Sequence, residues 1–205
     1  MTESVDVFSA VVKISIICLS AIGLFCNSGI IQKKFRKSMF VYFTNLSLLF
    51  CFLYFTAALV SEDSEFLCFI NGFVVLAVTL TMAVFHFVLA PARRKKPEGF
   101  QLHFSDIVAH YAVPLVVIAE WLVFAEKGQF AFYYPLLWGV PFILYFFATV
   151  VYAKSGGYLE YAESRYPYRF MDPDASGVKR VLRNVIILFF IIIGLGYILL
   201  LIDAI

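Results

Sequence analysis

The sequence predicts an all-α membrane protein with six transmembrane helices in a single bundle, and composition carries most of that prediction. Hydrophobic residues make up 62% of the 205 positions and charged residues only 15%, whereas a soluble domain is roughly 45–50% apolar and about 25% charged. Aromatic residues account for 19%, including 24 Phe, more than a water-soluble fold of this size can bury. These figures exclude disordered chains, nucleic-acid-binding modules and secreted disulfide scaffolds.

The apolar residues occur in six runs, each long enough for a helix to cross the hydrocarbon layer, which takes about 20 residues. A helix satisfies its own backbone hydrogen bonds in lipid. The runs are continuous and about twice as long as the strands of a transmembrane barrel, which excludes a barrel. The predicted spans, which form one domain over residues 1–205, are 11–31, 40–60, 66–90, 105–124, 131–153 and 181–202.

Charge is distributed unevenly between the two sides of the predicted bundle. Fourteen of the 16 Lys and Arg residues follow the first, third and fifth spans. They are Lys33, Lys34, Arg36, Lys37, Arg93, Arg94, Lys95, Lys96, Lys154, Arg165, Arg169, Lys179, Arg180 and Arg183. The opposite side collects Glu3, Asp6, Glu62, Asp63, Glu65 and Asp203. By the positive-inside rule, both termini are expected on the non-cytoplasmic side.

Polar residues inside five of the spans gather at one depth, near their cytoplasmic ends. This layer contains Asn27, Ser28, Thr44, Asn45, Ser47, His86, Asp106, His110 and Asn184. The outer half is mostly aliphatic or Phe, with Asn71 and Glu120 as the main exceptions. Because polar groups are costly in lipid, such a layer indicates a functional site.

Several members of this layer also have purely structural interpretations. A Thr in a membrane helix usually bonds back to the carbonyl four residues earlier, and this applies to Thr44 taken alone. Asn27 and Asn184 are typical of side chains that hold helices together. Asp106 either caps the fourth helix or, four residues before His110, orients its ring.

The histidines are harder to explain structurally, because a neutral imidazole in lipid needs partners. His86 and His110 lie at the same predicted depth, which suggests a shared polar cavity. Pro114 follows His110 by four residues and cannot donate to its carbonyl, so we expect a kink beside the site. Thr44, Ser47 and Cys51 share one helical stripe. A hydroxyl nucleophile with an imidazole base is the minimum set for acyl transfer.

Other kinds of chemistry have weaker support in the sequence. Neither HExxH nor GxSxG occurs, and no Gly-rich phosphate loop is present. Asp106 and the two histidines could hold a metal, and a His pair could ligate haem, but the spacing is not diagnostic. We therefore expect no metal and no cofactor.

The long loop before the last span contains RYPYRFMDP at residues 165–173, with Tyr166, Arg169 and Asp172. Two interpretations stay open for it: an interfacial aromatic belt that contacts lipid phosphates, or a lid over the polar layer. In the last span, Gly194 and Gly196 are expected at positions of close helix packing.

Four segments resemble motifs of one six-span family. They are YFTNLS at 42–47, HF at 86–87, HYAVPLVVIAEW at 110–121 and YPYRFMD at 166–172. Nearly the whole chain resembles the androgen-induced protein family, which includes the androgen-dependent TFPI-regulating protein, and its bacterial branch in particular. Animal members are membrane threonine hydrolases that cleave fatty acid esters of hydroxy fatty acids.

The resemblance implies a nucleophile at Thr44 and a base at His110. It implies an intramembrane lipid-ester hydrolase of a bacterial cytoplasmic membrane, acting at the cytoplasmic leaflet. Asn45, Asn184 or His86 would donate to the oxyanion. We expect membrane lipids and a lipid ester as partners, and no nucleic acid. The alternative is a membrane protein that binds or transports lipids or small molecules without covalent chemistry.

Overall fold

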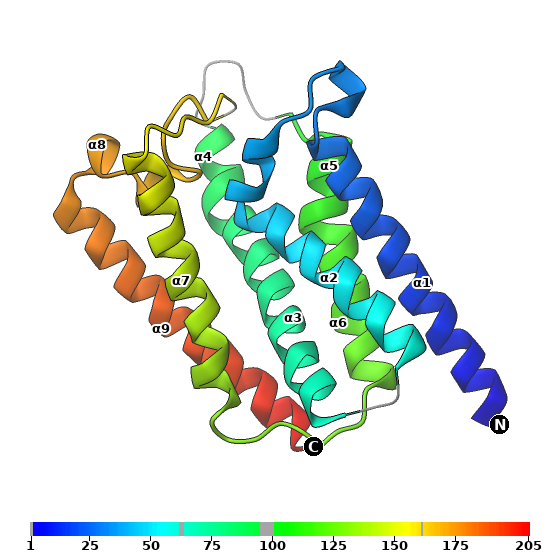
Figure 1. The fold of residues 1–205 in the computed structure, drawn as a ribbon. Coiled ribbons are helices and arrows are strands. Elements are labelled where there is room, and N and C mark those ends of the chain that lie inside the picture. The colour runs from blue at the N-terminus through cyan, green and yellow to red at the C-terminus, as the bar shows by residue number, and fades with distance from the viewer. Residues whose placement is uncertain (1, 62–63, 95–100, 161) are drawn as a thin grey trace. The chain divides into compact units, whose positions relative to one another are not determined.

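The computed structural model describes residues 2–61, 64–94, 101–160 and 162–205, with side chains from residue 7 onward. Within these ranges the chain forms helices and no β-strand, and the predicted all-α class is confirmed (Figure 1). The long helices are α1 (Thr2–Asn27), α2 (Phe43–Val60), α3 (Glu65–Val84), α6 (Val113–Phe124), α7 (Tyr134–Lys154) and α9 (Val178–Asp203). The short ones are η1 (Ile30–Gln32), η2 (Lys37–Val41), η3 (Phe85–Leu89), α4 (Ala90–Arg94), α5 (Phe104–Ile107), η4 (Val108–Ala112), η5 (Arg169–Met171) and α8 (Pro173–Ser176).

Six helical segments are long and apolar enough to cross a membrane, as predicted. They are Val7–Gln32, Phe43–Val60, Glu65–Arg94, Phe104–Phe124, Tyr134–Lys154 and Val178–Asp203. The third, fourth and sixth begin one to three residues earlier than predicted, and the second and fifth begin three residues later.

The chain divides into two compact units, residues 1–129 with four spans and residues 130–205 with two. The prediction that all six spans form one domain stays a prediction. In the first unit, α1 and α3 each contact both α2 and α6. The centre of its core is α3, where residues 74–78 are each at most 1% exposed. A Cβ at Gly23 of α1 would lie 2.8 Å from Leu48 Cδ1, so this glycine lets α1 approach α2 closely.

In the second unit, α7 packs against α9. A Cβ at Gly196 would lie 2.9 Å from Pro135 Cβ, which confirms that position as a close approach. A Cβ at Gly194 would meet nothing within 4 Å, so the same expectation was wrong there, because Gly194 lies on another face of α9. Asp203 Oδ2 accepts a hydrogen bond from the backbone N–H of Phe130 at 2.8 Å and joins the two ends of the unit.

The third and fourth spans each contain one π-helical turn, η3 and η4, of five residues. Each turn is followed by one ordinary residue and then a proline, Pro91 or Pro114. A proline cannot donate the backbone hydrogen bond that would continue the α-register. The irregularity expected at Pro114 is therefore a π turn on its N-terminal side, and His110 lies inside it.

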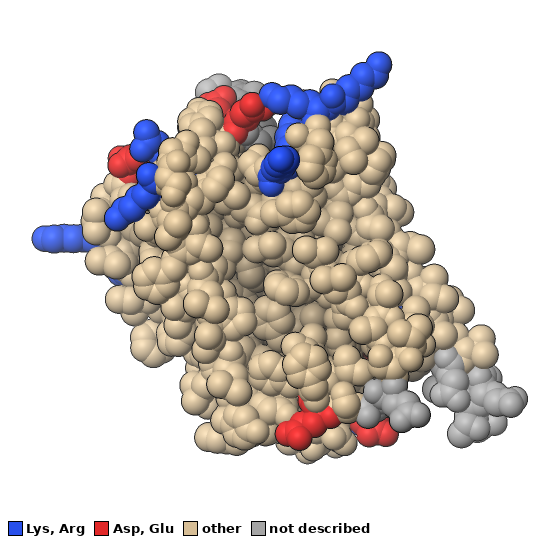
Figure 2. Space-filling model, in the orientation of Figure 1, with Lys and Arg blue, Asp and Glu red and all other residues tan. Residues whose placement is uncertain are grey.

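Apart from Lys13 in α1 and Lys127 after α6, the described basic side chains lie at one end of each unit. Figure 2 shows Lys and Arg side chains gathered over the η1–η2 segment and over the start of α9. Lys95, Lys96, Glu62 and Asp63, which entered the charge argument, lie outside the described residues, as do the side chains of Glu3 and Asp6. The basic end of the first unit is also the end at which α2 begins.

Candidate active site

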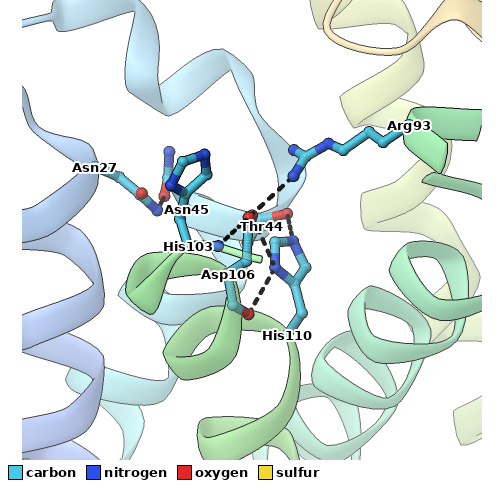
Figure 3. A network of polar contacts seen from close by, with 7 residues as sticks. All are labelled: Asn27, Thr44, Asn45, Arg93, His103, Asp106 and His110. Carbon is cyan, nitrogen blue, oxygen red and sulfur yellow. Dashed lines mark hydrogen bonds and ion pairs between the residues drawn. The ribbon is translucent and has the colours of Figure 1, made fainter. Parts of the chain in front are cut away.

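Thr44 is the second residue of α2, and its hydroxyl faces His110 in the π turn η4. Thr44 Oγ1 and His110 Nε2 are 3.3 Å apart, although 66 residues separate them in the chain (Figure 3). His110 is buried, at 8% exposure, and Thr44 is half-buried. The two residues assigned to nucleophile and base by the resemblance are therefore in contact.

The contact with His110 sets Thr44 apart from most other hydroxyls in the spans. Each of five other hydroxyls donates to the backbone carbonyl four residues earlier: those of Ser15, Ser47, Thr56, Thr79 and Thr81. This is the usual behaviour of hydroxyls in membrane helices. Thr44 instead lies just after the 3-10 helix η2, and its hydroxyl contacts the imidazole of His110.

The other ring nitrogen of His110 determines which nitrogen carries the proton. His110 Nδ1 lies 3.1 Å from the backbone carbonyl oxygen of Asp106. A carbonyl can only accept, so Nδ1 carries the hydrogen and donates it. In the neutral ring, Nε2 then has the free lone pair, directed at the Thr44 hydroxyl. This is the tautomer that a general base requires.

Of the two roles left open for the Asp106 carboxylate, the structure shows the helix cap and not the contact that would orient His110. Its Oδ1 is 3.9 Å from His110 Nδ1, beyond hydrogen-bond distance. Its Oδ2 accepts from the backbone N–H of His103 at 3.3 Å and from Arg93 at 3.0 Å. Asp106 therefore caps the start of α5 and pairs with Arg93, while its main chain orients the ring of His110.

Two residues near the site escaped prediction. The ring of Phe85 stacks on His110, with centroids 3.9 Å apart and an interplanar angle of 17°. The Arg93 guanidinium lies over the same Phe85 ring, 5.5 Å from its centroid. Arg93 was used only as one of a run of basic residues, and a Phe in a Phe-rich span carries no distinguishing signal. The sequence did offer one signal for Arg93: Asp106 begins the next span at the same end of the bundle, so the two could have been predicted to form an ion pair.

The amides and hydroxyls predicted to support Thr44 have other partners. Asn45 Oδ1 accepts from Asn27 Nδ2 at 2.8 Å, and Asn45 Nδ2 donates to the Met39 carbonyl at 2.8 Å. The first bond joins α2 to α1, as expected for Asn27, and the second joins α2 to η2. The Ser47 hydroxyl lies 3.0 Å from that of Thr81 and links α2 to α3. Ser47 and Cys51 are buried, as the shared stripe predicted.

His86 does not share a cavity with His110, which corrects the expectation. His86 is exposed, and its Nδ1 lies 3.1 Å from the hydroxyl of Tyr111. His110 is buried against Phe85 with Thr44 and Asp106 as its polar partners. Equal depth along neighbouring helices did not bring the two rings together, because they lie on different faces.

Asn184 belongs to the second unit, where its Nδ2 donates to the Phe170 carbonyl at 3.1 Å. It therefore holds the loop before α9 in place rather than joining two membrane helices. In that loop, Asp172 Oδ1 accepts from the N–H groups of Asp174 and Ala175 at the start of α8. Asp172 Oδ2 accepts from Ser164 Oγ at 2.7 Å.

The remaining loop residues complete this internal network. The backbone carbonyl of Arg169 accepts from Ser176 Oγ at 3.0 Å, and the Arg169 side chain is exposed. Tyr166 is buried, and burial raises its pKa above the ordinary value, with the carboxylates of Asp174 and Asp172 adding to the effect. The loop is thus ordered within its own unit, and the role of Tyr166, Arg169 and Asp172 as a lid stays a prediction.

Metal binding has no support among the residues that the structure describes, which contain no group of three His, Cys, Asp or Glu placed to hold an ion. The fold and the site together define a helical membrane-spanning protein with a hydroxyl–imidazole pair. Comparisons of the chain with models of protein families, with curated proteins and with solved structures found no match. The family resemblance thus stays an expectation.

Proposed function

We propose that this protein is an intramembrane lipid-ester hydrolase in which Thr44 is the nucleophile and His110 the general base. The observation that carries the proposal is the 3.3 Å contact between Thr44 Oγ1 and the unprotonated Nε2 of His110. A hydroxyl becomes an effective nucleophile when an adjacent base can take its proton. The resemblance of YFTNLS and HYAVPLVVIAEW to the motifs of threonine hydrolases supports the same assignment.

The reaction follows from this geometry in two steps. In the first, the Thr44 proton moves to His110 Nε2 while Oγ1 attacks the ester carbonyl carbon. The ester C–O bond then breaks, the alcohol leaves with the proton from Nε2, and the acyl group stays on Thr44. In the second step His110 takes a proton from water, which attacks the acyl carbon. The carboxylic acid leaves and Thr44 regains its proton.

The charge that develops on the carbonyl oxygen needs a donor. Asn45 Nδ2 donates to the Met39 carbonyl, Asn184 belongs to the second unit, and His86 lies on a different face from His110, so we do not assign the donor to these three. Thr44 lies in the first turn of α2, where the backbone N–H groups of Asn45 and Leu46 both donate to the Tyr42 carbonyl. We assign the stabilisation of the oxyanion to the positive end of the helix dipole at this helix start, which favours negative charge.

The substrate is expected to be a membrane lipid ester of the class of fatty acid esters of hydroxy fatty acids. The pair lies at the basic end of the first unit, which the positive-inside rule assigns to the cytoplasmic leaflet, with both termini on the other side. An ester group at this depth reaches Thr44 sideways from the bilayer while its acyl chains stay among apolar side chains. The site needs neither a metal nor a cofactor.

The test compares two threonines of the same helix. Thr44→Ala is expected to lower ester hydrolysis by roughly 10³-fold or more, since it removes the nucleophile. Thr56→Ala is the matched control, because Thr56 is exposed and bonds only to the Phe52 carbonyl. The assay is hydrolysis of a synthetic fatty acid ester by purified protein, together with covalent labelling by a fluorophosphonate.

Labelling that survives Thr44→Ala would contradict the nucleophile assignment. Wild-type protein that binds the ester but neither hydrolyses it nor accepts the label would favour the alternative, a lipid-binding or transport protein. Thr44→Ser keeps the hydroxyl and is expected to retain measurable labelling, which separates loss of the nucleophile from loss of the fold.

A further inference from the structure

A groove of about 380 Å³ lies in the first unit between the third and fourth spans, on the side of His86 rather than of His110. Its wall contains His86, Phe87, Pro91, Arg94, Leu102 and Tyr111. None of these residues takes part in the proposed hydrolysis. Phe87 is 75% exposed and Leu102 is 44% exposed, so the groove is open at the surface.

The polar groups of the groove occur at two depths. Arg94 is the last residue of α4 and of the third span, at its basic end. His86 lies eight residues earlier in the same span, about 12 Å deeper at 1.5 Å per residue. Between these depths the wall is apolar, with Phe87 and Pro91. A ligand that fits this wall has an anionic group at the membrane surface and a neutral hydrogen-bond acceptor below it.

The deeper polar group is a donor in either arrangement of its protons. If the Tyr111 hydroxyl donates to His86 Nδ1, the neutral imidazole carries its hydrogen on Nε2. If Nδ1 donates to the Tyr111 oxygen, the hydroxyl hydrogen is left for another acceptor. The pair therefore keeps one N–H or O–H donor toward a ligand, at a depth where water is scarce and an uncompensated polar group is costly.

We infer that this groove binds one anionic phospholipid. Arg94 contacts the phosphate, the His86–Tyr111 pair donates to an ester carbonyl of the glycerol backbone, and one acyl chain lies against Phe87. A phospholipid has its phosphate and ester carbonyls at successive depths, as the groove has its cation and its donor. Basic residues at cytoplasmic helix ends are attracted to anionic lipids for the same electrostatic reason.

A free fatty acid fits the groove less well. Its carboxylate could reach Arg94, but nothing polar follows along the chain to meet His86 and Tyr111. A zwitterionic phospholipid satisfies the donor pair but adds a positive head group beside Arg94. The observations therefore favour a lipid with both ester carbonyls and a net negative head.

The experiment measures lipid binding to the purified, delipidated full-length chain by native mass spectrometry. Phosphatidylglycerol, phosphatidylcholine and palmitate are titrated separately. The wild type is expected to bind one phosphatidylglycerol in preference to phosphatidylcholine. Arg94→Gln is expected to weaken phosphatidylglycerol binding by roughly fivefold and to remove the preference. The double variant His86→Leu/Tyr111→Phe is expected to weaken both phospholipids by roughly fivefold and to keep the preference.

The matched control is Lys37→Gln, which removes an exposed basic residue at the same end of the first unit but outside the groove. If Lys37→Gln and Arg94→Gln weaken phosphatidylglycerol binding equally, the preference comes from general attraction to the basic surface and not from the groove. An unchanged preference in Arg94→Gln, unchanged binding in the double variant, or palmitate that binds as tightly as phosphatidylglycerol would each overturn the proposal. Binding is measured without turnover, so the result is independent of whether Thr44 is a nucleophile.

Discussion

His86 and His110 occupy similar places in two neighbouring spans. Each lies in a five-residue π turn that is followed, after one ordinary residue, by a proline. Their environments differ, because His110 is buried beneath Phe85 and His86 is exposed beside Tyr111. His110 bonds to a backbone carbonyl through Nδ1 and faces a hydroxyl through Nε2.

The two histidines differ in their hydrogen-bond partners, and the partner of a histidine determines which of its ring nitrogens can accept. A backbone carbonyl can only accept, so it fixes one tautomer of His110 and leaves a lone pair for Thr44. A tyrosine hydroxyl can donate or accept, so it fits either tautomer of His86. The first arrangement suits a base in catalysis, and the second suits a donor toward a neutral ligand.

The largest effect is expected when His110 is replaced. His110→Ala should lower ester hydrolysis by about 10²–10⁴-fold, because the nucleophile loses its base. His86→Leu should change phospholipid binding instead. Measurement of kcat and of phospholipid affinity for both variants tests whether the two histidines have separate functions. Equal losses of hydrolysis in the two variants would show that they do not.

A double variant tests whether Thr44 and His110 act together. Residues that act as one catalytic unit have strongly non-additive effects. Thr44→Ala combined with His110→Ala should hydrolyse the ester no more slowly than the slower single variant. If the double variant instead loses hydrolysis by the product of the two single losses, Thr44 and His110 act independently and not as one catalytic unit.

A smaller effect is expected from the proline that follows the π turn of His110. Pro114→Ala restores an N–H that can donate to the His110 carbonyl, which favours the α-register and rotates the imidazole away from Thr44. Hydrolysis should fall by roughly 10–100-fold, whereas the thermal midpoint should not fall, because Ala is a better helix former.

Pro141→Ala in α7 is the matched control, since Pro141 lies inside a helix of the second unit and the residue four positions before it, Leu137, is no catalytic candidate. Its hydrolysis should stay within about twofold of the wild type. A Pro114→Ala enzyme with full activity would show that the π turn is not what aims His110 at Thr44.

The fold could be predicted from the sequence because the lipid bilayer constrains the composition of every segment that crosses it. A span must be apolar over its length, so six apolar runs predicted six helices with boundaries close to the observed ones. Individual contacts do not follow from that rule. Gly194 and Gly196 are two residues apart in the same helix, yet only Gly196 meets a neighbour, since packing depends on rotation about the helix axis.

The site was accessible only in part. Thr44 and His110 came from the resemblance, and spacing alone could not bring together residues on separate helices. Spacing did relate Asp106 to His110, but it pointed to the carboxylate, whereas the main-chain carbonyl makes the bond. The π turn changes the register of this segment, so positions counted on an ideal α-helix no longer share the expected face.

The smallest effect on activity is expected for the carboxylate of Asp106. Asp106→Asn keeps the backbone carbonyl that accepts from His110 Nδ1, so hydrolysis should fall by less than roughly tenfold. Where a carboxylate itself orients the histidine of a triad, the same change costs about 10⁴-fold. The substitution instead removes the ion pair with half-buried Arg93, which should lower the thermal midpoint by about 2–4 °C.

Arg93→Gln provides the matched measurement, because it removes the other member of the same pair. It should lower the thermal midpoint by a similar amount, and the double variant Asp106→Asn/Arg93→Gln should be little worse than either single one. A loss of hydrolysis near 10³-fold in Asp106→Asn would mean that the carboxylate, 3.9 Å from Nδ1 in this structure, becomes its acceptor during turnover. In that case His110 would be oriented as in a carboxylate triad, and the contrast with His86 would depend on a side chain rather than on the π-turn backbone.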